Sequence, residues 1–276
     1  MSKPADLHIH SYYSDGTSSP EEIVEQALQA DLSCIAVTDH DTIGGIALTM
    51  DSACGHDLEV LSGIELSSHI HNRDVHVLGY LFDYKNRDLV QTLTAMQDSR
   101  QERMKKMVEK LKELGVTNIE LADVDSKAQS DSIGRPHLAA VLVDKGKVSS
   151  IKEAFDKYLA EGAPAYMSKF KYTPFEAIDI IKKAGGLAVL AHPMLTQIDE
   201  LIPQLVKAGL DGLEVYYPYT SENMVHFYEG LALKHNLLLT GGSDAHGTVK
   251  KHTHIGRIRI SYDLVEKMKH RQKEQF

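Results

Sequence analysis

The alternation of apolar and polar residues at the start of the chain predicts a short buried strand. Leu7 and Ile9 take one face and His8 and His10 the other, because successive side chains of a strand point to opposite faces. Asp15 follows just beyond the strand end. Two neutral imidazoles and a carboxylate are suitable ligands for Zn, Mn or Fe. Taken alone, however, a His-x-His pair is equally typical of a structural role.

Later apolar runs alternate with helical patterns and predict a repeating strand-helix order. Ser19, Pro20 and Glu22 form a helix-start signature, with the helix ending near Ala30. The apolar run ending at Thr38 is typical of a strand buried on both faces of a parallel sheet. Further strands are expected at 59–64, 74–80, 187–191, 212–216 and 237–240, with helices at 45–53, 174–184, near 203 and at 221–235, and a final strand and helix at 255–260 and 264–275. Seven such units favour a barrel or a large open sheet.

The pattern changes near residue 86. Apolar residues recur at three- and four-residue steps from Leu89 to Leu114, with a break at Arg100, which predicts a long amphipathic helix whose stripe packs into a core. Further helices are expected at 136–144 and 150–161, and no strand is expected between about 95 and 171. We therefore assign residues 1–94 and 172–276 to one discontinuous α/β domain and residues 95–171 to an all-helical insertion.

Length and charge indicate which fold and which kind of substrate to expect. The 276 residues suit one large α/β domain or a barrel with an insertion. A net charge of -9 argues against a general nucleic-acid surface, although bound dications would offset clustered carboxylates. The insertion, with 14 Lys and Arg against 12 Asp and Glu, is the least acidic part and is suited to an anionic substrate.

The cysteines and the hydropathy indicate a compartment. Cys34 lies in a strand-like run, and with Cys54 it makes no disulfide framework, which predicts a reducing cytoplasm. No charged-then-apolar leader and no long apolar run is present, so neither a signal peptide nor a membrane span is expected.

Nine potential metal ligands fall in or just after six of the seven predicted strands. In a parallel barrel those strand ends converge on one face, where active sites are found. Nine ligands are too many for one ion and suit two or three, with carboxylates able to bridge neighbouring ions. The set is His8, His10, Asp15, His40, Glu65, His76, His192, Asp244 and His246.

Six segments carry a resemblance to a known family. They are Asp6-Leu7-His8-Ile9-His10-Ser11, Thr38-Asp39-His40-Asp41-Thr42, Gly63-Ile64-Glu65, Val75-His76-Val77-Leu78-Gly79-Tyr80, Ala191-His192-Pro193 and Gly242-Ser243-Asp244-Ala245-His246-Gly247. They resemble the motifs of the PHP (polymerase and histidinol phosphatase) superfamily. The insertion, with Gly134-Arg135-Pro136-His137, resembles the stand-alone branch that includes nucleoside 3',5'-bisphosphate phosphatases and 5'-3' exoribonucleases.

The resemblance implies a fold, a cofactor and a division of ligands. It implies a distorted (β/α)7 barrel and a trinuclear centre of divalent ions, with Mn as first choice and Zn, Fe or Mg as the others. Asp15, His40 and His246 would hold one ion. The other two ions would be held by His8, His10, Glu65, His76, His192 and Asp244, with Glu65 bridging. Ala245 departs from the family pattern, where Phe is frequent, and this weakens the inference about the substrate.

The chemistry expected of such a centre is phosphate ester hydrolysis. Three dications against three carboxylates leave about three positive charges, which suits a phosphate dianion, and metal-bound water has a pKa near ~7. A metal-bridging hydroxide is expected to attack phosphorus at a site where Asp244 is catalytic. Arg135 is chosen to hold the phosphoryl oxygens because its donors match phosphate, and a salt bridge is its alternative. His137 would donate to the leaving oxygen or the substrate, or else cap a helix.

Other polar residues keep two interpretations. Asp39 and Asp41 would orient ligand histidines or form turns. His69 and His71, expected in the loop before the fourth strand, and His252 and His254 would contact substrate or solvent. Tyr216, Tyr217 and Tyr219 would stack on a base or pack at the rim.

The predicted function is hydrolysis of phosphate monoesters of small nucleotides of the 3',5'-bisphosphonucleotide type, with trimming of short oligonucleotides from the 5' end as a related activity. Histidinol-phosphate hydrolysis is the alternative. An amidohydrolase acting on C–N bonds is disfavoured, since no strand-end Lys is evident. A metal-binding module without turnover is also disfavoured, because the ligand set is intact.

Overall fold

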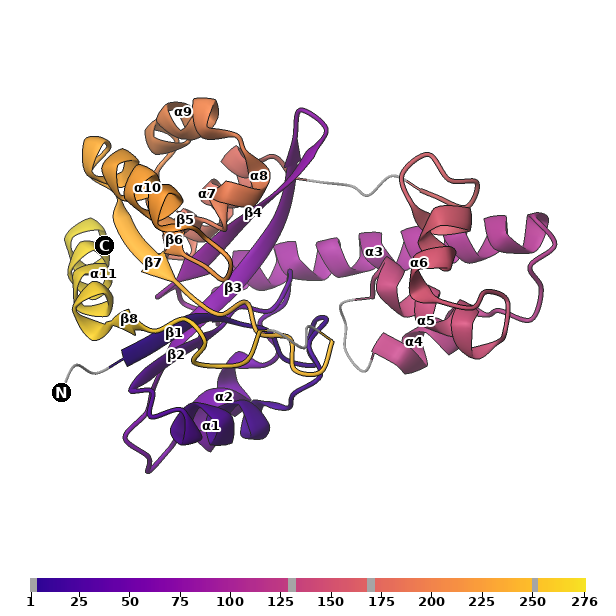
Figure 1. The fold of residues 1–276 in the computed structure, drawn as a ribbon, viewed down its shortest axis with the longest axis horizontal. Helices are drawn as coiled ribbons and strands as arrows, with labels where there is room; N and C mark the ends of the chain where they lie inside the picture. Colours follow the sequence, from indigo (N-terminus) through magenta and orange to yellow (C-terminus); the bar gives the residue numbers. More distant parts are fainter. Residues whose placement is uncertain (1–3, 129–132, 168–171, 250–252) are drawn as a thin grey trace. The chain divides into compact units, whose positions relative to one another are not determined.

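The computed structural model describes residues 4–128, 133–167, 172–249 and 253–276. The chain divides into two compact units, which we call the barrel unit (1–90 with 171–276) and the helical unit (91–170). Figure 1 shows that the strands belong to the barrel unit and that the helical unit is built from helices and loops. No helix within the described ranges combines the length and the hydropathy needed to cross a membrane.

Within these described ranges, eight strands form one nearly closed sheet in the order β7-β6-β5-β4-β3-β2-β1-β8. Ile9 makes a parallel bridge to Ala245, and the His10 N–H donates to the Ala245 carbonyl at 2.9 Å, so the segment after β7 joins β1. The expected distorted barrel is thereby confirmed. The strands are β1 (Pro4–Ile9), β2 (Cys34–Val37), β3 (Glu59–Ile70), β4 (Arg73–Tyr80), β5 (Leu187–Leu190), β6 (Leu210–Tyr216), β7 (Leu238–Gly241) and β8 (Ile260–Ser261).

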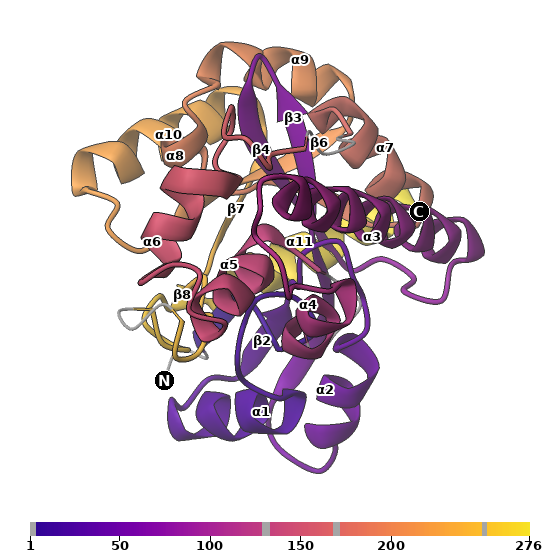
Figure 2. The same ribbon diagram turned by 90° about the vertical axis from the view of Figure 1, so that its right-hand side faces the viewer.

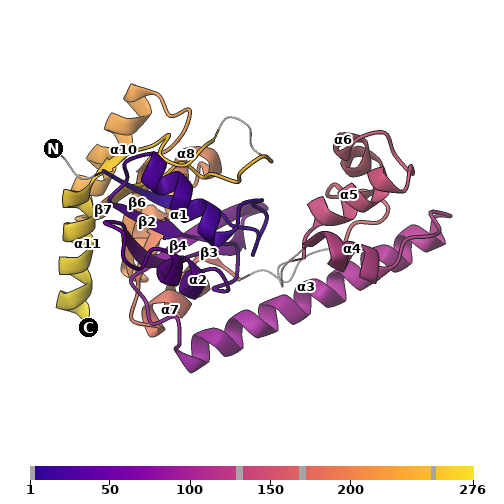
Figure 3. The same cartoon turned by 90° about the horizontal axis from the view of Figure 1, so that it is seen from below.

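The helices of the barrel unit cover the sheet. Helices α1 and α2 lie side by side against β2 and β3, as Figure 2 shows, and α11 packs against β1, β7 and β8 (Figure 3). Apolar faces of these helices cover the outer face of the sheet, and every residue of β1 and β2 except the half-buried Pro4 is buried. The helices are α1 (Pro20–Gln29), α2 (Ile46–Ser52), α7 (Pro174–Lys183), α8 (Pro193–Thr196), α9 (Ile202–Lys207), α10 (Glu222–Lys234) and α11 (Tyr262–Gln275), with a 3-10 turn η2 (Asp199–Leu201).

Two of the described strands depart from the expected parallel order: the short β8, which pairs antiparallel with β1, and β4. β4 runs antiparallel to both β3 and β5, so the seven strand-helix units predicted from the sequence are wrong at this point. β3 continues to Ile70, and only His71 and Asn72 join it to β4. Both of these residues have positive φ, 50° and 60°, as a tight two-residue hairpin turn requires. Because the turn is so short, no crossover helix fits between the two strands.

The helical unit has a hydrophobic core of its own. The long helix α3 (Arg87–Glu113) contributes Met104, Met107 and Leu111, all buried, and it is continuous through Arg100. Leu138 and Leu142 pack on the same cluster from α5. The remaining elements are α4 (Leu121–Ala128), α5 (Arg135–Asp144), α6 (Ile151–Ala154) and a π-helical turn η1 (Phe155–Leu159).

Three local expectations were wrong. The α4 helix was not predicted, since its short sequence with Asp123 and Asp125 carries little apolar periodicity. Leu114, taken as the end of the buried stripe, lies beyond the last residue of α3 and is 48% exposed. The strand expected at 255–260 is reduced to the two residues of β8.

Leu111 and Leu114 provide a matched test of this core. Leu111→Ala should lower the free energy of unfolding of the helical unit by about 2–5 kcal/mol, because a buried leucine leaves a cavity. Leu114→Ala should change it by no more than about 0.5 kcal/mol, because that side chain is half in solvent. Urea denaturation, with amide hydrogen exchange of α4 and α5, measures both. Equal losses for the two variants would contradict the packing described.

Candidate metal centre

Glu65 lies at the middle of the polar cluster in the barrel unit. Its side chain, on β3, is 1% exposed. A carboxylate has about four lone-pair directions, so it cannot accept a full hydrogen bond from all the rings that face it. Its two oxygens lie 2.8–3.3 Å from a nitrogen of five imidazoles, those of His8, His10, His40, His76 and His192.

Each of these rings reaches Glu65 for a local reason. His8 and His10 share one face of β1 through strand alternation, with ring centroids 5.1 Å apart. His40 follows β2 and makes a parallel bridge to Glu65 itself. His192 follows β5. These positions explain why residues distant in sequence meet at one carboxylate.

His76 reaches the cluster by a route that the sequence analysis did not foresee. It lies within β4 rather than at a carboxyl end. In the hairpin Glu65 pairs with Leu78 and His76 pairs with Ser67, which makes Glu65 and His76 diagonal neighbours on one face. The His76 Nδ1 lies 2.8 Å from Glu65 Oε1 as a result.

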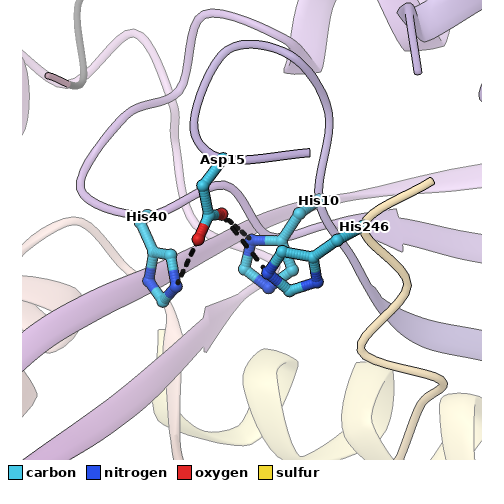
Figure 4. A group of neighbouring side chains, drawn as sticks. All are labelled: His10, Asp15, His40 and His246. Carbon is cyan, nitrogen blue, oxygen red and sulfur yellow. Dashed lines mark ion pairs between the residues drawn. The ribbon is translucent and has the colours of Figure 1, made fainter. Parts of the chain in front are cut away.

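A second group of donors adjoins the first and shares His10 and His40. Figure 4 shows Asp15 pointing between His10, His40 and His246. Asp15 Oδ1 lies 3.3 Å from His246 Nε2 and 3.7 Å from His10 Nδ1, and Asp15 Oδ2 lies 3.9 Å from His40 Nε2. The three residues that the resemblance assigns to one ion therefore lie together.

Asp244 connects the two groups. It follows β7 with a positive φ of 48°, which turns its carboxylate toward β1. Its Oδ1 lies 3.3 Å from His10 Nε2, 3.6 Å from His8 Nε2 and 3.4 Å from His246 Nδ1. All nine side chains predicted as ligands are thus brought together in the barrel unit.

Burial and opposite charge act against each other in this cluster. Burial raises the pKa of the Glu65 carboxyl, but the charges of His40, His76 and His8 outweigh it and hold that pKa well below its usual range. Burial similarly lowers the pKa of His10, yet hydrogen bonds to Asp244 and Glu65 raise it to about 9. Glu65 therefore stays ionised and needs positive charge beside it, which either protons or metal ions supply.

The donor set fits divalent metal ions. Three sets of residues each place their donor atoms within 4.8 Å of one another: His10, Asp15, His40 and His246; His8, His10 and Glu65; and His40, Glu65 and His76. Imidazole and carboxylate together are the ligands that Zn, Mn and Fe accept.

The sequence analysis missed one residue at this site and did not foresee the contact made by another. Glu214, on β6, is 0% exposed, and its Oε1 lies 2.7 Å from His8 Nδ1. The signal was available, because Glu214 is a charged residue inside an apolar strand. The Tyr217 hydroxyl donates to Asp244 Oδ2 at 2.7 Å, so this tyrosine supports a predicted ligand where stacking on a base had been considered.

Asp39 and Asp41 each accept hydrogen bonds from serines of other segments of the barrel unit. Asp39 accepts hydrogen bonds from the Ser11 N–H at 2.8 Å and from the Ser14 hydroxyl at 2.6 Å. Asp41 accepts one from the Ser67 N–H at 2.7 Å. Each of these bonds joins residues 25 to 28 positions apart, so it links separate segments and is not the local turn considered for these carboxylates; their orienting role stays a prediction.

Arg135 and His137 lie at the start of α5 in the helical unit. The Arg135 guanidinium lies 5.6 Å from the ring centres of both Phe155 and Tyr166, and its Nη1 donates to the Leu159 carbonyl at 3.3 Å. The His137 Nδ1 accepts a hydrogen bond from the Gly134 N–H at 3.1 Å, the capping contact considered for it. Their roles toward phosphate stay predictions.

The other histidines and tyrosines take varied positions. His69 lies in β3, with its Nδ1 3.3 Å from Asp74 Oδ1, and not in the loop expected before β4. His71 lies in the hairpin turn, and His254 is exposed beside a small cavity of 180 Å³. His252 lies outside the described residues. The Tyr216 hydroxyl donates to Glu229, and Tyr219 is 70% exposed.

Comparisons with known proteins agree on the family. The PHP domain matches residues 6–161. The chain is 32% identical to the 5'-3' exoribonuclease Rnm of Escherichia coli (strain K12), over 87% of this chain and 84% of that protein. It is 33% identical to a 3',5'-nucleoside bisphosphate phosphatase of Chromobacterium violaceum, over 87% of this chain and 86% of the relative.

A solved structure agrees with these relatives. It is a protein from Bifidobacterium adolescentis described as a metal-dependent phosphoesterase, with a TM-score of 0.85 and 31% identity over 97% of this chain and 96% of that one. The chain therefore belongs to the PHP domain family and is a phosphoesterase of that family.

Proposed function

We propose that this phosphoesterase uses two or three divalent ions to hydrolyse phosphate monoesters of small nucleotides. The 3',5'-bisphosphonucleotides are the preferred class, with the 5' ends of short oligonucleotides as further substrates. The observation that carries the proposal is the convergence of six imidazoles and three carboxylates, with buried Glu65 at the middle. The nucleotide class rests on the names of the two relatives.

The residues divide into ligand groups as the family resemblance implies. Asp15, His40 and His246 would hold one ion. The remaining ligands would hold the others around Glu65: His8, His10, His76, His192 and Asp244. When bound, such ions lower the pKa of water and neutralise phosphoryl oxygens. His and carboxylate ligands accept several divalent ions, and among Mn, Zn, Fe and Mg we propose manganese first, as the family resemblance implies.

Charge balance supports a phosphate dianion as the ligand of this centre. Three dications would face the carboxylates of Asp15, Glu65, Asp244 and Glu214, which leaves about two positive charges in a buried pocket. The three ligand carboxylates alone would leave about three positive charges. Glu214 adds a fourth negative charge and lowers the remainder to about two. A net charge near +2 matches a dianionic monoester and gives no advantage to a neutral amide.

Arg135 and His137 are our candidates for contacts to substrate. The planar guanidinium carries five N–H donors, and the rings of Phe155 and Tyr166 hold it in place. We assign Arg135 to the phosphoryl oxygens and His137 to the leaving oxygen. We propose a cytoplasmic location for the enzyme, and the two free cysteines support it, because disulfides are rare in a reducing compartment.

The first test combines metal analysis with a substrate panel. Protein purified without chelator should contain two or three equivalents of divalent metal and release phosphate from adenosine 3',5'-bisphosphate, and chelation should abolish this release. Histidinol phosphate, a 5'-phosphorylated oligonucleotide and an amide are the comparison substrates. Faster turnover of histidinol phosphate would replace the nucleotide assignment, and release of ammonia or amine from the amide alone would contradict phosphoesterase chemistry.

Two ligand variants test the centre itself. His192→Ala and Asp244→Ala should abolish phosphate release and lower the amount of bound metal. The first removes an imidazole beside Glu65, and the second removes a carboxylate beside His10. His270→Ala is the control, since that side chain is 76% exposed on α11 and should keep full activity. Phosphate assays and elemental analysis provide the measurement. Undiminished turnover in either ligand variant would rule out its assigned role.

Arg135→Ala separates substrate binding from metal binding. We expect kcat/KM to fall roughly 10- to 100-fold, since a hydrogen bond to a charged group is worth about 1.5–3 kcal/mol, while metal content stays unchanged. Arg135→Lys keeps the charge but loses the planar fork, and it should recover only part of the activity. If Arg135→Ala leaves both kcat and KM unaltered, the phosphate role is wrong.

A further inference from the structure

The strand β6 contributes none of the nine predicted ligands, yet it carries a fully buried carboxylate beside them. Glu214 is 0% exposed and lies between the apolar residues Leu213 and Val215. Burying a carboxylate is costly unless its oxygens are hydrogen-bonded. The partners of Glu214 therefore indicate what compensates for that cost.

One oxygen of Glu214 orients His8. Glu214 Oε1 lies 2.7 Å from His8 Nδ1, and because an ionised carboxylate only accepts hydrogen bonds, His8 Nδ1 is the donor. A neutral His8 then has its lone pair on Nε2. That nitrogen lies 3.2 Å from Glu65 Oε2 and 3.6 Å from Asp244 Oδ1, on the side where the other donors converge.

The other oxygen fixes the backbone of His192. Glu214 Oε2 accepts a hydrogen bond from the His192 N–H at 2.8 Å. His192 has φ 29° and ψ 59°, a conformation that is uncommon for a residue other than glycine and needs support from its surroundings. In this conformation its Nε2 lies 3.1 Å from Glu65 Oε1.

We propose that Glu214 is a positioning residue of the metal centre: it sets the tautomer of His8 and the backbone conformation of His192, so that both rings present Nε2 to the ions. Both of its oxygens are engaged in these bonds, so it acts through the two histidines rather than as a ligand. The inference rests on the proposed metal centre. A carboxylate behind a ligating imidazole fixes its orientation and raises its basicity.

Asp211, on the same strand, provides a matched control. It is 3% exposed and its Oδ2 accepts a hydrogen bond from the Ala188 N–H at 2.9 Å, as Glu214 does from His192. Its other partners are Lys182 and Gln275, not metal-site residues. Asp211→Asn should therefore affect stability without affecting metal binding.

The experiment titrates metal-free protein with Mn²⁺ and with Zn²⁺ by calorimetry. Glu214→Gln keeps the shape of the side chain, but its amide has one acceptor oxygen where the carboxylate has two. This variant should bind metal roughly 10- to 100-fold more weakly. The control Asp211→Asn should bind metal as tightly as the unaltered protein. Thermal unfolding of the metal-free proteins reports stability separately. Equal affinity in Glu214→Gln and the unaltered protein would overturn the positioning role alone, whereas absence of metal binding by the unaltered protein would overturn the proposed function as well.

A second measurement needs no variant. Nitrogen NMR of the Zn-loaded unaltered protein should show His8 protonated at Nδ1 and metal-bound at Nε2. The opposite arrangement would contradict the proposal even if Glu214→Gln does not fold.

Discussion

The centre of this protein depends on a carboxylate that is buried among imidazoles. Glu65 is almost inaccessible to solvent, and five rings approach it within 3.3 Å. Isolated in an apolar interior, such a charge would be strongly unfavourable. The surrounding histidines make it tolerable, but they exceed the hydrogen-bonding capacity of one carboxylate. This excess of donor atoms over acceptor sites is the physical reason for interpreting the cluster as a binding site for several cations.

Bringing those rings together depends on closure of the sheet. The segment after β7 pairs with β1 through Ala245, and this contact carries Asp244 and His246 to His8 and His10. Space at the junction is tight, since a Cβ atom on Gly242 would lie 2.3 Å from the His8 backbone nitrogen. Glycine at this position lets the two ends of the sheet approach closely enough for their side chains to share one centre.

The two units have separate tasks in the function we propose. The barrel unit contains the whole set of candidate metal ligands, held mostly on rigid strands or directly after them. The helical unit holds Arg135 against two aromatic rings above a core that includes Met107 and Leu111. Chemistry and recognition of phosphate esters are thereby assigned to parts of the chain with independent hydrophobic cores.

The sequence by itself determined the elements and the candidate ligands, because their signals are local. Strand alternation placed His8 and His10 on one face, and a helix-start signature located α1. The strand β4 was predicted but its antiparallel direction was not, because the direction depends on the two-residue turn at His71 and Asn72, both with positive φ. Only the tertiary structure decided that His76 meets Glu65 across a hairpin. It alone showed that Glu214 supports two histidines far away in the chain, because long-range pairing leaves no periodic trace in sequence.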